Sequence, residues 1–113
     1  MHATQLAETT DRGWCIRIGE VFDLEVAAEC LRHCRDDKTF PPEKLLFDLT
    51  RTRLLSTAGI GAMLHIKHEY QVNDERAVIV YQDPAVGELL RLSRLHQSFQ
   101  LLARGWEDCH AIK

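Results

Sequence analysis

The sequence predicts a single α/β domain, in which helices cover a four- to five-stranded sheet that is largely parallel or mixed. Runs of strand length alternate along the chain with amphipathic runs of helix length, and this order produces crossover connections between parallel strands. The 113 residues are 45% hydrophobic and 27% charged, which suits one core and argues against disorder. The sequence has no internal repeat and no long linker, so we expect residues 1–113 to form one unit.

The first half of the chain predicts a hairpin followed by a helix. Residues 14–19 alternate apolar and polar side chains as a half-buried strand does, and a turn at residues 11–13 makes residues 4–10 the partner strand. A helix is expected to begin after the N-cap residue Asp23 and to end before the Pro41-Pro42 pair. Its predicted inner face consists of Leu24, Ala27, Ala28, Leu31 and Cys34.

The second half predicts three more strands and two more helices. The strands are expected at residues 44–49, 76–82 and 99–102. The first of the two helices opens at Ser56 and is expected to bury Ile60, Met63, Leu64 and the stem of Lys67. The second starts at Asp83-Pro84 and is expected to be lined by Val86, Leu89, Leu90 and Ser93. A final helical turn is predicted within residues 105–113.

Composition excludes several classes of function. The net charge of −3 argues against non-specific nucleic-acid binding, which favours a basic surface. No apolar run is long enough to span a membrane, and the N-terminus lacks the pattern of a secretory signal. We therefore expect a cytoplasmic protein, with its four cysteines as reduced thiols and with no cofactor. No phosphate-binding loop, nucleophile elbow or other catalytic motif is present, so no enzyme activity is expected.

The segment Ser56-Thr57-Ala58-Gly59 lies at the start of a helix, where backbone N–H groups lack intrahelical partners. Ser56 or Thr57 is suited to cap the helix, and the same position suits a phosphate on Thr57. Gly59 and Gly61 fall within one turn, which indicates close packing of this helix on the sheet or a flat surface for a partner helix. Asp48, at the end of the preceding strand, is either a turn acid or a residue that orients this segment.

Several motifs in this order resemble the STAS domain family, which includes anti-sigma factor antagonists and cytoplasmic domains of sulfate transporters. Residues 48–50 match a strand that ends in Asp-Leu-Ser/Thr, and residues 56–61 match the family's Asp-Ser-Ser-Gly-Leu-Gly segment. Upstream, the residues 19–31 resemble the approach to the family's first helix. The helix pattern that follows is matched by Pro84, Val86, Leu90 and Leu95. The resemblance covers residues 13–102.

The resemblance implies a sheet with helices packed largely on one side and a role in binding a protein partner. In the sigma-factor regulators of the family, an anti-sigma factor that is also a kinase contacts the loop and helix that correspond to residues 56–70. Phosphorylation of a hydroxyl residue in that loop breaks the contact. The partner-binding residues implied for this chain are Asp48, Ser56, Thr57, Ala58, Gly59, Ile60 and Gly61. Because Ser56 and Ala58 replace the usual acidic and second hydroxyl residues, Thr57 is the candidate phosphorylation site.

The sequence is also compatible with other interpretations. The chain could be a cytoplasmic STAS subunit of a lipid or anion transport complex, and a second copy of the chain is a further candidate partner. Cys30, His33 and Cys34 could form part of a metal or small-ligand sensor, although packing in the core is the simpler interpretation. A helix face is expected to be solvated or to form part of a partner surface, and it consists of His65, His68 and Glu69. Four arginines are either scattered surface charges or a cluster that could meet an acidic partner, namely Arg51, Arg53, Arg91 and Arg94.

Overall fold

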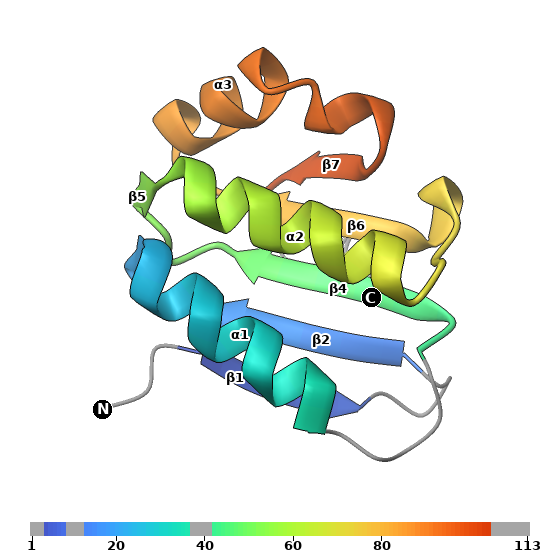
Figure 1. Ribbon diagram of the computed structural model, residues 1–113. Helices are drawn as coiled ribbons and strands as arrows, with labels where there is room; N and C mark the ends of the chain where they lie inside the picture. The colour runs from blue at the N-terminus through green and yellow to red at the C-terminus, as the bar shows by residue number, and fades with distance from the viewer. Residues whose placement is uncertain (1–3, 9–12, 37–41, 105–113) are drawn as a thin grey trace.

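The computed structural model describes residues 4–8, 13–36 and 42–104, and one five-stranded sheet forms its centre (Figure 1). In spatial order the strands are β1 (Thr4–Glu8), β2 (Gly13–Ile18), β4 (Lys44–Leu49), β6 (Ala77–Tyr81) and β7 (Gln100–Ala103). β1 runs antiparallel to β2, and the other neighbours are parallel. The predicted mixed sheet and the antiparallel pairing of its first two strands are thus confirmed. The turn predicted at residues 11–13 lies largely outside the described residues, and the helical turn predicted within residues 105–113 lies wholly outside them.

Three α-helices and two short 3-10 helices connect the strands. Their bounds are α1 (Leu24–Asp36), α2 (Thr57–Glu69), η1 (Asp74–Arg76), α3 (Pro84–Leu92) and η2 (Leu95–Gln97). Figure 1 shows α1 and α2 side by side across one face of the sheet, with α3 toward the β7 edge. The expectation that helices pack largely on one side is therefore confirmed.

Alternation along the central strands defines the core. On β2 the side chains of Trp14, Ile16 and Ile18 are buried, and on β4 those of Leu45, Phe47 and Leu49 are buried. The side chains between them, such as Cys15 and Asp48, are half-buried on the opposite face of the sheet. Successive strand residues point to opposite faces, so only one face of each strand contributes to the core under the helices.

The predicted inner faces of the helices were partly wrong. On α1 the buried residues are Ala27, Cys30 and Cys34, whereas Leu24 and Ala28 are exposed. On α2 and α3 the predicted inner residues Leu64, Leu89 and Ser93 are exposed as well. Each helix buries only a narrow stripe against the sheets and its neighbours, so apolar side chains at the margin of that stripe reach solvent.

A second, two-stranded sheet was not predicted. β3 (Val21–Phe22) pairs in parallel with β5 (Leu54–Leu55), next to the beginnings of α1 and α2. Thr52, whose side chain is fully buried, donates its hydroxyl to the carbonyl of Gly19 at 2.8 Å and joins the two loops that lead into these strands. Strands of two residues are too short to show a periodicity, which is why the sequence gives no signal for them.

Candidate docking surface

Ser56 is the N-cap of α2 and also fastens the helix to β3. Its side-chain oxygen accepts a hydrogen bond from the backbone N–H of Gly59 at 3.2 Å and donates to the carbonyl of Phe22 at 2.9 Å. The backbone N–H of Ser56 donates to the same carbonyl at 2.9 Å. Of the two hydroxyl residues weighed as caps, Ser56 therefore has this role, and Thr57 occupies the first helical position with an exposed side chain.

Replacing Ser56 with alanine is expected to lower the free energy of unfolding by about 1–2 kcal/mol, because one capping bond and one bond to Phe22 are lost. Ser56→Asp should recover only part of this loss, since a carboxylate caps a helix but cannot donate to the Phe22 carbonyl. Urea denaturation of the variants, with Thr57→Ala as control, measures the effect. An equal loss in Thr57→Ala would contradict the assignment of the cap.

The two glycines of α2 have different surroundings. A Cβ atom on Gly59 would lie 2.8 Å from Cγ of Phe22 and 3.0 Å from the Phe22 carbonyl oxygen. A Cβ atom on Gly61 would meet nothing within 4 Å, and Gly61 is exposed. Close packing is thus confirmed for Gly59 and wrong for Gly61, which instead leaves a gap in the outer surface of the helix.

Asp48 makes the bonds of a turn acid. Its Oδ1 accepts hydrogen bonds from the backbone N–H of Thr50 at 3.0 Å and from the Thr50 hydroxyl at 2.6 Å. Its Oδ2 lies 3.8 Å from Nε of Arg17 on β2. These contacts are on the sheet face opposite the buried side chains of β4, so the geometry favours the turn role over orientation of the residues that open α2.

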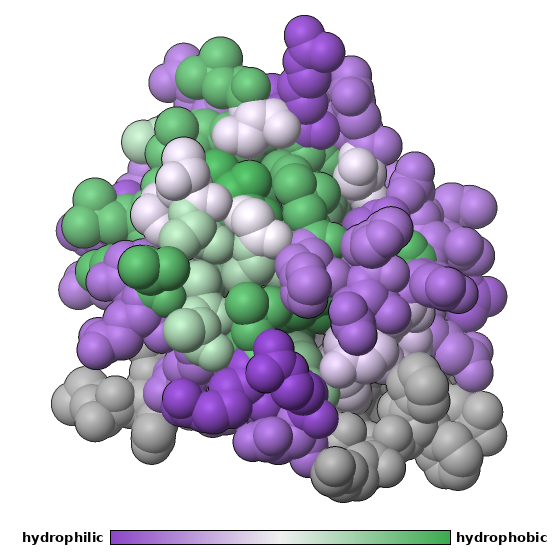
Figure 2. Space-filling model, in the orientation of Figure 1, coloured by the Kyte–Doolittle hydropathy of each residue, from purple (hydrophilic) through white to green (hydrophobic). Residues whose placement is uncertain are grey.

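Five leucines are exposed on α1, β5, α2 and α3. We name Leu24 of α1, Leu54 of β5, Leu64 of α2, and Leu89 and Leu92 of α3 the leucine surface; their side chains are 37% to 74% exposed. Figure 2 shows apolar surface gathered where Figure 1 places β5, the first turns of α2 and α3, while the lower right of this view is hydrophilic. A contiguous exposed apolar area of this kind is typical of an interaction site.

The four arginines predicted as a cluster lie in the loop before β5 and at the end of α3. The guanidinium of Arg91 donates to the hydroxyl of Tyr81 at 2.6 Å and lies 5.8 Å from the centre of the Tyr81 ring. Within the described part of the chain, the exposed residues Arg51, Arg53 and Arg94 have no ion pair. β5 packs against α3, so the loop that contains Arg51 and Arg53 ends beside that helix.

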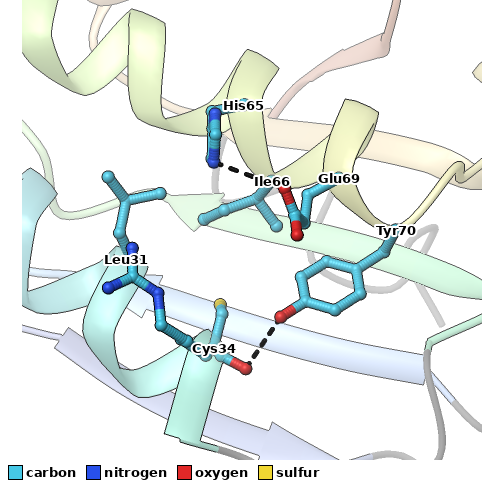
Figure 3. Close-up of a pocket in the computed structure, with 7 residues that line it drawn as sticks. Leu31, Cys34, His65, Ile66, Glu69 and Tyr70 are labelled. Atoms are coloured by element: carbon cyan, nitrogen blue, oxygen red, sulfur yellow. Dashed lines mark hydrogen bonds and ion pairs between the residues drawn. The ribbon is translucent and has the colours of Figure 1, made fainter.

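The thiols of α1 belong to the core beside a small cavity. Cys30 and Cys34 are buried, and a cavity of about 70 Å³ between α1 and α2 touches Cys34 (Figure 3). The Tyr70 hydroxyl donates to the Cys34 carbonyl at 2.9 Å, and His65 pairs with Glu69 at 3.6 Å on the rim. Among the described residues, no three His, Cys, Asp or Glu side chains are placed to hold a metal ion. The described residues therefore give no support to the metal interpretation of Cys30, His33 and Cys34, and the two thiols pack in the core.

A hydrogen bond to the Cys34 thiol and burial raise the pKa of the Cys30 thiol above its ordinary value. In the unfolded chain a cysteine thiol loses its proton near pH 8.5, whereas in the folded protein the Cys30 thiol retains its proton to higher pH. Stability from this group is present below that pH and is lost as the pH rises above it. We expect the urea midpoint to fall between pH 7 and pH 10 by more in the wild type than in Cys30→Ala. Equal changes in both proteins would contradict this cause.

Comparisons with known proteins agree with this architecture. The family model of the STAS domain matches residues 5–108, and the chain therefore belongs to the STAS domain family. Within the described part of the chain, no helix combines the length and apolarity that a membrane crossing requires. No curated protein matches the sequence.

Two solved structures show the same fold. An anti-sigma factor antagonist from Mycobacterium paratuberculosis is 17% identical, with a TM-score of 0.68 over 96% of this chain and 92% of that chain. The anti-sigma factor antagonist SpoIIAA in its unphosphorylated form is 13% identical, with a TM-score of 0.64 over 96% of both chains. At these identities the similarity establishes the fold, and function has to be argued from the residues of this chain.

Proposed function

We propose that this STAS domain is a non-catalytic, cytoplasmic regulator that docks on a kinase-type anti-sigma factor. The observation that carries the proposal is the leucine surface, which includes Leu54 just before α2 and Leu64 on α2, the helix where the family resemblance implies partner contact. Gly61 adds to it, because a helix with no side chain at an exposed position lets a partner approach closely. The similarity in fold to two anti-sigma factor antagonists supports the same class of partner.

A binding titration tests the proposed docking. A purified kinase-type anti-sigma factor is titrated into the wild type and into Leu64→Ser, which changes an exposed side chain of the surface. We expect saturable binding by the wild type and an affinity lower by about ten-fold or more in the variant. Leu102→Ser, which changes an exposed leucine on β7, is the matched control. Equal affinity of all three proteins, or binding only to a transporter ATPase, would overturn the proposal.

Phosphorylation of Thr57 is the proposed control of this docking. Thr57 is exposed at the first position of α2, beside Leu54 and Leu55 of β5. A phosphate there would be tolerated by the domain, because the helix start offers backbone N–H groups and a partial positive charge. Docking of an apolar partner surface would instead require the desolvation of a group that carries about −1.5 to −2 charges, which weakens binding.

Incubation with the kinase partner and ATP, followed by measurement of the intact mass, tests this site. We expect one added phosphate on the wild type, none on Thr57→Ala, and loss of binding by the phosphorylated protein. A phosphate that is also added to Thr57→Ala would assign the modification to another residue. Ser56 serves as the comparison residue within the same protein. We expect no phosphate on it, because its hydroxyl forms hydrogen bonds with Phe22 and Gly59.

A further inference from the structure

The leucine surface has opposite charges at its two ends. Around Leu24, at the start of α1, lie the exposed acids Glu20, Asp23 and Glu25. They outnumber the exposed base Arg53, whose backbone N–H donates to the Glu20 carbonyl at 2.8 Å. Around Leu92, at the end of α3, lie the exposed bases Arg91 and Arg94. Glu88 is an exposed acid on α3, and the two arginines outnumber it. The surface therefore runs from an acidic end at α1, across β5 and α2, to a basic end at α3.

Such a surface is complementary to a copy of itself. A two-fold rotation axis that passes through the middle of the leucine surface, near Leu54, would place the acidic end of one molecule on the basic end of the other. The leucines of the two copies would meet between these ends, in the arrangement of an apolar centre with a charged rim that protein interfaces use. Both rim contacts form at once because the interface is isologous.

We infer that a second copy of this chain occupies the leucine surface when no other partner is bound, and forms a two-fold symmetric dimer. Glu25 and Arg94 are suited to form its rim contacts, because neither has an ion pair within the described residues. The dimer covers the start of α2, so Thr57 becomes inaccessible in it. On the proposed function, self-association then competes with docking on the anti-sigma factor, and the dimer is the resting state of the protein.

Charge reversal tests the dimer, and its expected result, recovery of dimerisation in a mixture of two variants, could not arise from unfolded proteins. In Glu25→Arg both rim contacts of the dimer become base against base, and in Arg94→Glu both become acid against acid. We expect each variant alone to raise the dimer dissociation constant by on the order of ten-fold or more. In an equimolar mixture of the two variants both contacts pair opposite charges again, so a heterodimer of wild-type affinity is expected.

Sedimentation equilibrium at several concentrations measures these constants, with the wild type, each variant and the mixture compared at one ionic strength. Glu75→Arg, which makes the same charge change at η1, is the control and should dimerise as the wild type does. Leu92→Ser should weaken the dimer, and Leu102→Ser should not. A wild type that is monomeric at every concentration, or a mixture that stays as monomeric as its components, would overturn the inference. Binding of the anti-sigma factor by such a monomer would leave the proposed docking intact and make that partner the occupant.

Discussion

Replacement of Gly59 by alanine is expected to lower the free energy of unfolding by about 2–3 kcal/mol, near the upper end for overpacking. The added Cβ would lie 2.8 Å from Cγ and 3.0 Å from the carbonyl oxygen of Phe22, closer than such atoms pack. Phe22 is fully buried, and its carbonyl accepts hydrogen bonds from the backbone and the hydroxyl of Ser56. Neither group is free to retreat, so α2 must move off the β3–β5 sheet.

Gly61→Ala is the matched control for this change. It places the same methyl group two positions further along α2, where nothing lies within 4 Å. Because alanine favours a helix over glycine, we expect this variant to be more stable than the wild type by about 1 kcal/mol. Urea denaturation of both variants gives the comparison, and two changes of the same sign would show that the packing of α2 on Phe22 is described wrongly.

Glutamine at position 61 is expected to raise the dissociation constant for the anti-sigma factor by about 100-fold without loss of stability. The side chain has space to extend, since Gly61 is exposed and nothing lies near its Cβ position. It would stand one turn before Leu64 and next to Ile60, inside the area where a partner must approach. The polar amide would separate the two apolar surfaces and would be desolvated on docking.

Calorimetric titration with the same anti-sigma factor measures this effect, and Glu75→Gln at η1 is the control with the same new residue. The unfolding transition of Gly61→Gln should match or exceed that of the wild type, which separates lost docking from lost folding. Wild-type affinity in a well-folded Gly61→Gln would mean that the partner does not contact this part of α2.

The strands and the helix starts could be predicted because local side chains determine them. The alternation of apolar and polar side chains in residues 14–19 indicates that Trp14, Ile16 and Ile18 face the core, and all three are buried. Capping by Ser56 and Asp83 depends on bonds within a few residues of each, to Gly59 and Ala85 respectively. Such signals lie within one turn or one strand, so the sequence alone contains them.

The docking surface could not be predicted in the same way, because it depends on which apolar side chains remain exposed after the helices have packed on the sheets. Leu64 and Leu89 have apolar side chains at helical spacing, and only their position at the margin of the packed stripe makes them accessible. The difference between Gly59 and Gly61 arises from Phe22, which is distant in sequence and lies in a strand of two residues. These relations exist only once β3 and β5 have brought the starts of α1 and α2 together.

We propose that partners dock on the leucine surface, on and beside α2. Backbone amide chemical shifts of the isotope-labelled wild type, recorded as purified anti-sigma factor is added, test it directly. We predict that the largest changes fall on residues 54–65 and on α3, with few on β2 and β4. Changes confined to the opposite face of the sheet, around Cys15 and Asp48, or to the cavity beside Cys34, would contradict the claim.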